Sequence, residues 1–89
     1  MDKISLDKDE FVLLNIINER DKGSGVSTPI IDRVFYDKRL AEGCSLDNLY
    51  SVQWIPISKR LEELGLIEKQ GLLNKITEKG RDVLKGYEE

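Results

Sequence analysis

The last third of the chain carries an apolar pattern with the spacing of an amphipathic helix. Ile57, Leu61 and Leu64 recur on one side of a helix with 3.6 residues per turn. Gly65 follows the last of these leucines, where a residue with positive φ can close a helix without steric cost. We therefore expect a helix over about residues 52–64 that buries one face and ends at Gly65.

A short β-hairpin is predicted directly after this helix, over about residues 66–76. Leu66 and Ile67 restart the chain as an apolar strand, and Gln70-Gly71 interrupts it. The following residues alternate between two sides, as in a half-buried return strand: Leu72, Asn74 and Ile76 on one side, Leu73 and Lys75 on the other.

A final helix is predicted to begin after the hairpin. Thr77 is placed to accept hydrogen bonds from the free amides of the first helical turn, and Glu78 suits the positive end of the helix dipole. Gly80 lowers the helix propensity of this segment. We expect a capped but intrinsically weak helix.

The amino-terminal part of the chain predicts a strongly apolar first helix. Asp7 and Glu10 have the spacing of a capping box, so we expect a helix over residues 8–21. Its apolar stripe consists of Phe11, Leu13, Leu14, Ile16 and Ile17. Such a stripe is wider than one packed face requires. Either the helix is central in its own domain, which is the commoner arrangement, or part of the stripe packs against another subunit.

A short strand and a second helix follow the Gly23-Ser-Gly25 loop. Val26 and Ser27 are expected to pair with the hairpin, and Thr28-Pro29 to open the helix, because proline at the first helical position loses no hydrogen bond. The helix should end near residues 41–43. Its expected buried side consists of Ile30, Ile31, Val34, Phe35 and Leu40.

The segment between residues 45 and 56 allows two interpretations. In the first, Ser45 caps a helix that continues into residues 57–64, with a kink where Pro56 removes a hydrogen bond. In the second, residues 46–50 form a separate helical turn and the next helix starts near residues 52–55, with Pro56 in its first turn. We favour the second.

The order of these motifs resembles the winged helix-turn-helix transcriptional regulators of the multiple-antibiotic-resistance, arsenic-resistance and PadR types. Two signatures carry the resemblance over about residues 54–85: Leu61, Gly65, Leu66 and Ile67 in the first, and Ile76, Thr77, Glu78, Lys79 and Gly80 in the second. The resemblance implies a mainly α (α+β) fold, a winged helix in which a helical bundle carries a two- to three-stranded β-hairpin wing. It also implies binding to double-stranded DNA. The hairpin is therefore the expected wing, and the preceding helix the expected recognition helix.

Composition agrees with one small globular domain over residues 1–89. The chain is 39% hydrophobic and 35% charged, has no histidine, and contains one cysteine, Cys44. No apolar run approaches the length of a membrane span, and the first seven residues lack a signal sequence, so we expect a cytoplasmic protein. Cys44 is expected to be an ordinary loop or core residue; the alternative is a single-cysteine thiol sensor.

Charge is unevenly distributed along the chain. The net charge is −3, and it arises in residues 1–50, whereas basic and acidic residues balance in residues 51–89. Candidate DNA contacts on the helix are Ser51, Ile55, Ser58, Lys59 and Arg60, and those on the wing are Lys69, Gln70 and Lys75. In this register Ser51, Ile55 and Lys59 share the solvent-facing side, with Ser58 at its edge. Glu62 and Glu63 would repel phosphate, which leaves only the front half of the helix for a groove.

No catalytic, metal or cofactor site is predicted, because no nucleophile or acid has an evident activating partner. The expected function is DNA-binding regulation of transcription, with a homodimer that reads two half-sites. Surplus apolar residues of the first helix and Val83, Leu84 and Tyr87 of the last are candidates for the dimer interface. The alternative is a winged helix used as a protein-interaction module, which the acidic net charge would suit.

Overall fold

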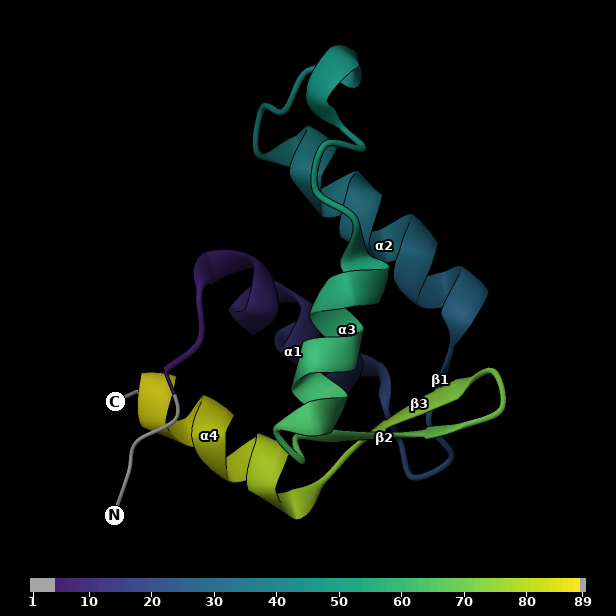
Figure 1. Cartoon of the computed structure of the whole chain (residues 1–89), viewed down its shortest axis with the longest axis vertical. Helices are drawn as coiled ribbons and strands as arrows, with labels where there is room; N and C mark the ends of the chain where they lie inside the picture. Colours follow the sequence, from purple (N-terminus) through teal and green to yellow (C-terminus); the bar gives the residue numbers. More distant parts are fainter. Residues whose placement is uncertain (1–4, 89) are drawn as a thin grey trace.

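The computed structural model describes the backbone of residues 5–88 and the side chains as far as Gly86. Four α-helices, one short 3₁₀ helix and three strands follow one another along this part of the chain (Figure 1). Their bounds are α1 Lys8–Arg20, β1 Val26–Ser27, α2 Thr28–Ala41, η1 Leu46–Asn48, α3 Trp54–Glu63, β2 Ile67–Gln70, β3 Leu73–Ile76 and α4 Glu78–Glu88.

The three strands form one antiparallel sheet in the order β1-β3-β2. Strands β2 and β3 are the predicted wing, joined by a two-residue turn at Gly71 and Leu72, and β1 pairs with the outer side of β3. Gly71 has a φ of 62°, which explains why glycine occupies the turn. Leu72 belongs to the turn and is exposed, so its predicted place in the half-buried strand was wrong. The mainly α fold with a small β-hairpin wing is confirmed.

Helix α1 lies at the centre of the molecule and packs against α2, α3, α4 and strand β3. Its capping box is present, with Asp7 and Glu10 each accepting a hydrogen bond from the other's backbone amide. Four of its apolar residues have no exposed surface: Leu13, Leu14, Ile16 and Ile17. The broad stripe is therefore used inside this chain, as the first of the two interpretations expected.

Helix α2 is only partly covered. Ile31 and Phe35 are buried, whereas Ile30 and Leu40, which the pattern assigned to the buried side, are 49% and 41% exposed. The exposure of Leu40 follows from the projection of the second half of α2 and η1 beyond the rest of the fold (Figure 1). Ile30 lies in the first turn, about 100° around the helix from the buried Ile31. Arg39 holds the chain after α2 in place, because its guanidinium donates to the backbone carbonyls of Asn48 and Leu49.

The second interpretation of residues 45–56 is confirmed. Residues Leu46–Asn48 form a separate 3₁₀ turn, and α3 begins at Trp54 with Pro56 as its third residue. Proline is tolerated there because amides of the first helical turn have no partner inside the helix. Gly65, with a φ of 79°, follows the end of α3 as predicted.

Gly80 takes part in two contacts at the start of α4. Thr77 Oγ1 accepts from the amide of Gly80 at 3.0 Å, which confirms the predicted cap. A Cβ atom at Gly80 would lie 2.3 Å from the carbonyl oxygen of Leu66. The glycine that weakens α4 therefore permits its close approach to the chain that enters the wing.

Within residues 5–88, no helix has both the length and the apolar character needed to cross a bilayer.

Candidate nucleic-acid interface

Helix α3 is fixed to its neighbours near both ends. Near its start, Trp54 is buried and its indole Nε1 donates to Asp32 Oδ1 of α2 at 2.7 Å. Near its end, Arg60 forms an ion pair with Glu10 of α1. The Glu10 side chain is buried, so Arg60 neutralises a carboxylate that would otherwise be costly to enclose. Sequence reasoning missed both contacts, since the partners lie more than twenty positions apart.

The wing is attached to α3 by Lys69. Its Nζ donates to Ser58 Oγ at 3.0 Å, and Ser58 in turn donates to the carbonyl of Ile55 at 2.8 Å. Ser58 is fully buried, so its predicted position at the exposed edge of the helix was wrong. Ser58 shares the buried side of the helix with Trp54 and Leu61 and accepts from the wing, which makes it a positioning residue rather than a surface contact.

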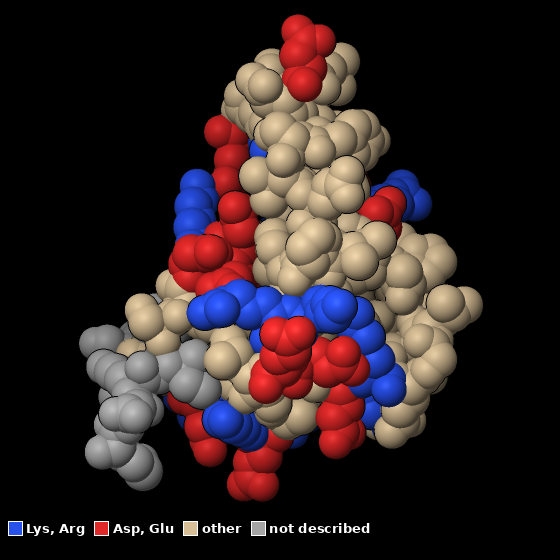
Figure 2. Space-filling model, viewed as in Figure 1, with Lys and Arg blue, Asp and Glu red and all other residues tan. Residues whose placement is uncertain are grey.

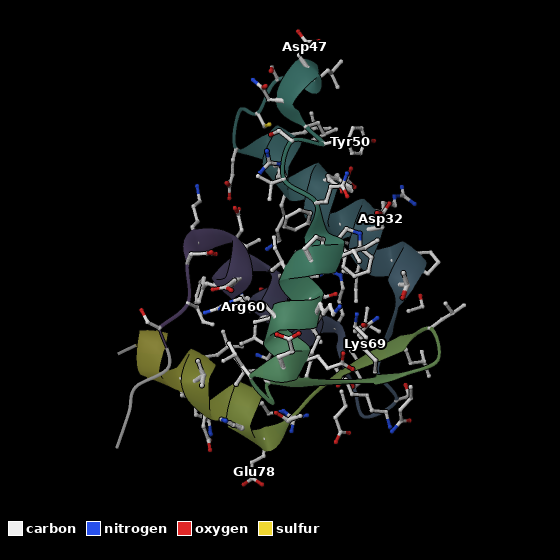
Figure 3. All side chains as sticks on the ribbon, in the orientation of Figure 1. Asp32, Asp47, Tyr50, Arg60, Lys69 and Glu78 are labelled. Atoms are coloured by element: carbon white, nitrogen blue, oxygen red, sulfur yellow. The ribbon has the colours of Figure 1, made fainter. Side chains whose placement is uncertain are left out.

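Lys59, Arg60 and Lys69 form a basic band across α3 and β2. Lys59 and Lys69 are exposed, and the Arg60 side chain remains 59% exposed despite its ion pair. Figure 2 shows the blue side chains as a band across the middle of this face, with red side chains beneath it and also above its left end. Figure 3 places Arg60 and Lys69 on the lower half of α3 and on β2. The basic band is therefore narrow, because acidic side chains lie directly next to it.

Acidic residues border the band from below. Glu62 and Glu63 are exposed at the end of α3, as predicted, and Glu68 is exposed on β2. Glu62, Glu68 and Lys69 also line the same open hollow between α3 and the wing. A polyanion could therefore approach the band only from the side of the start of α3.

Lys75 does not belong to this band. In the wing, Lys69 lies opposite the buried Asn74, whereas Lys75 lies opposite Glu68. Because side chains alternate between the two faces of a sheet, Lys69 projects towards α3 and Lys75 projects from the other face. The prediction of one cluster at the wing tip was wrong for Lys75, which lies beside Gly25 near the base.

The other predicted contacts lie in different places. Ser51 precedes α3 rather than sharing its outer face, and its hydroxyl donates to the Asn48 carbonyl at 2.7 Å. Ile55 is on the first turn of α3 and is 58% exposed, as expected. Gln70 is exposed next to the turn of the wing. Ile55, Lys59, Lys69 and Gln70 therefore remain accessible candidates, while Ser51 and Ser58 serve local structure.

A large part of the same face carries no charge. Residues 48–58 contain no Lys, Arg, Asp or Glu. Four apolar side chains on or beside this face are more than half exposed: Leu46, Tyr50, Ile55 and Leu72. Burial, followed by the negative charge of Asp32, raises the pKa of the nearby Tyr36 phenol above its ordinary 10.0, so that group is also neutral near pH 7. Figure 2 shows this area as continuous tan above the basic band.

The base of the wing is held by Asp21. Its carboxylate accepts from the amides of Gly23 and Gly25, both at 2.9 Å, and from the amide of Ile76 at 3.0 Å. Burial alone would raise the pKa of Asp21. The three backbone hydrogen bonds and the charge of Arg81 outweigh this effect, so the pKa lies below the ordinary 3.8.

No family model, curated protein or solved structure gives a significant match to this chain.

Proposed function

We propose that this protein is a DNA-binding regulator of transcription that contacts double-stranded DNA through α3 and the β2–β3 wing. The observation that supports this most is the Lys69–Ser58 hydrogen bond, which joins wing and helix and makes Lys59, Arg60 and Lys69 one basic band. Phosphate contacts from such a band position a protein on a duplex, and a neighbouring helix then reads base edges. The proposal places the protein in the cytoplasm and rests also on the winged-helix motifs of residues 54–85.

The exposure and ion pairing of each candidate residue indicate which part of the DNA it would contact. Lys59 is exposed and forms no ion pair with the residues that the structure describes, so it is the best candidate for a phosphate or a guanine. Lys69 and Gln70 suit backbone contact from the wing. Arg60 adds charge to the band, but its pairing with Glu10 makes it a poor reader of bases. Lys75 would reach phosphate only from the outer face of the wing.

The proposal includes a homodimer, since one winged helix reads few base pairs and two half-sites double the contact. Leu84 is buried and Val83 is partly buried, while the side chain of Tyr87 lies outside the described residues. The apolar stripe of α1 is enclosed as well. The exposed apolar residues of the projecting segment, Leu40, Leu46 and Tyr50, are therefore the better candidates for the contact. Light scattering that gives a monomer of about 10 kDa at high micromolar concentration would refute the dimer.

Anisotropy titrations of fluorescent genomic duplexes at two salt concentrations test DNA binding. Affinity should fall with salt, and removing one phosphate-contacting lysine should reduce the slope of log K against log salt by about one. The test variant replaces Lys59, Lys69 and Lys75 with alanine. The matched control replaces Lys8, Lys38 and Lys85, which removes the same charge from α1, α2 and α4. Equal binding by the two triple variants, or no binding by the wild type at low salt, would overturn the proposal.

A second candidate function is a protein-interaction module. It is favoured by the extent of uncharged surface and by the acidic residues beneath the band. Interface centres are depleted of charge and enriched in aromatic and apolar side chains, as around Tyr50 and Ile55. This candidate takes the place of the first if the wild-type protein binds no duplex.

A further inference from the structure

The surfaces that would face base edges lack cations. The first turn of α3 and the chain leading to it, residues 48–58, have no charged side chain, and neither have residues 70–74 at the wing tip. The charges of the interface are displaced to the middle of α3 and to β2, as the blue band in Figure 2 shows. Groups that position a duplex and groups that would read it are therefore separated in this molecule.

Three basic side chains lie nearest to the reading surface. Lys59 belongs to the basic band one turn after Ile55, and we assign it to phosphate; the other two are poorly placed to recognise guanine. Arg60 pairs with buried Glu10, and Lys69 donates to Ser58. The side chains that remain on the first turn are uncharged: Gln53, Ile55 and Pro56, all exposed. Of these, Ile55 is the large hydrophobic side chain, with 58% of its surface in solvent.

An exposed isoleucine distinguishes bases in the major groove by desolvation. Thymine presents a methyl group there, and its contact with Ile55 removes apolar surface from water. A G·C pair presents at that position either guanine N7, an acceptor that Ile55 would separate from water without replacing its hydrogen bond, or the C5–H of cytosine, which lacks the methyl group. The first turn of α3 thus favours A·T pairs.

The wing tip has the same preference for a different reason. Leu72 is 71% exposed in the turn, beside Gly71 with its positive φ. The floor of the minor groove has acceptors at A·T pairs but an additional amino donor at G·C pairs. A leucine pressed against that amino group would leave it without a partner, whereas apolar side chains do enter the minor groove at A·T-rich steps.

We propose that the duplex recognised by this protein is rich in A·T pairs, with Ile55 contacting a thymine methyl group in the major groove and Leu72 packing on the minor-groove floor. This inference rests on the proposed DNA-binding function. It assigns specificity to two exposed apolar residues and leaves to Lys59 and Lys69 the sequence-independent part of the affinity.

Four alternating duplexes of equal length separate the two contacts: dA·dT, dA·dU, dG·dC and dI·dC. Uracil lacks only the major-groove methyl group of thymine, and hypoxanthine lacks only the minor-groove amino group of guanine. The wild-type protein should bind dA·dT most tightly. Uracil should weaken binding about fourfold for each thymine methyl group that Ile55 covers, and hypoxanthine should strengthen binding relative to guanine by about tenfold.

The variants assign each preference to a residue. Ile55→Ala should bind dA·dT and dA·dU equally while still separating dI·dC from dG·dC, and Leu72→Ala should show the opposite pattern. Ile30→Ala, which removes an exposed isoleucine from the first turn of α2, should behave as the wild type. All three sites are exposed, so circular dichroism should show unchanged folding.

The possible results separate a failure of the A·T preference from a failure of the proposed DNA-binding function. If the wild-type protein binds no duplex, both fail, and the protein-interaction candidate takes their place. If it binds all four duplexes equally, or prefers dG·dC, DNA binding stands and the inference is overturned. The inference is also overturned if replacing thymine with uracil lowers the affinity of the wild type and of Ile55→Ala by the same factor. Another residue would then contact the methyl group.

Discussion

Helices α1 and α2 have similar lengths, but the fold uses them in opposite ways. In α1, the residues buried are Glu10, Leu13, Leu14, Ile16 and Ile17. In α2 only Ile31 and Phe35 are buried, and its second half projects from the molecule with η1 (Figure 1). Figure 3 shows Asp47 and Tyr50 at the end of this projection. One helix organises the core, and the other leaves apolar surface accessible.

Helix α3 contains the same division within ten residues. One side of the helix holds the buried Trp54, Ser58 and Leu61, whereas the other side presents Ile55 and Lys59 to solvent. Side chains locked by packing cannot adapt to a ligand, while exposed ones contribute little to folding. We therefore expect substitutions to separate stability from recognition along this helix.

The largest effect is expected at Leu61, which has no exposed surface. Leu61→Ala removes methyl groups from the core beneath α3 and should lower the free energy of unfolding by about 2 to 5 kcal/mol. Ile30→Ala in the first turn of α2, where the side chain is 49% exposed, should change it by less than about 0.5 kcal/mol. Urea denaturation measures both. If the free energy of unfolding of Leu61→Ala were unchanged, the assignment of buried and exposed sides of α3 would be wrong.

The second prediction is that alanine has opposite effects on stability at two glycines of α4. Gly80→Ala should lower the free energy of unfolding by about 1 to 3 kcal/mol, because the new Cβ would collide with the carbonyl of Leu66. Gly86→Ala in the same helix meets open space and should raise stability by up to about 1 kcal/mol. Thermal melts of the two variants decide this, and a stabilised Gly80→Ala would contradict the close packing of α4 on the chain that enters the wing.

Much of the fold could be predicted because its boundaries have local causes. The Asp7–Glu10 capping box, Pro29 at the start of α2 and the left-handed Gly65 each act within one turn of chain. The extent of burial was harder to predict. Leu40 fits the periodicity of a packed helix, yet it is exposed because no other described element covers the projecting part of α2. Ile30, in the first turn, was also assigned to the buried side and is exposed.

The candidate interface was less predictable, since its geometry depends on contacts between distant segments. The position of Ser58 is set by Lys69 on the wing, and the availability of Arg60 is set by Glu10 in α1. The separation of Lys75 from Lys69 could have been found from sequence. Given the turn at Gly71, the alternation of a hairpin already places these two lysines on opposite faces.

The third prediction concerns acid sensitivity at the base of the wing. The pKa of Asp21 is lower in the folded state than its ordinary 3.8, so its ionised form stabilises the fold at neutral pH. This contribution is complete above the unfolded pKa and is lost as pH falls through the folded pKa. Asp21→Asn should therefore be less stable than the wild type by about 1 to 3 kcal/mol near pH 7, and the difference should shrink below about pH 4. Denaturation at several pH values tests this, and a difference independent of pH would refute it.

The smallest expected effect tests the connection between wing and helix. Ser58→Ala and Lys69→Met each remove one side of a 3.0 Å hydrogen bond while keeping most of the side-chain volume. A double-mutant cycle should give a coupling energy of about 0.5 to 1.5 kcal/mol, near the lower limit because the Lys69 ammonium is accessible to water. The control cycle pairs Ser58→Ala with Lys75→Met, whose side chain leaves the wing on the other face, and should be additive. Equal coupling in both cycles would mean that Lys69 does not position the wing against α3, and the basic band would then lose its structural basis.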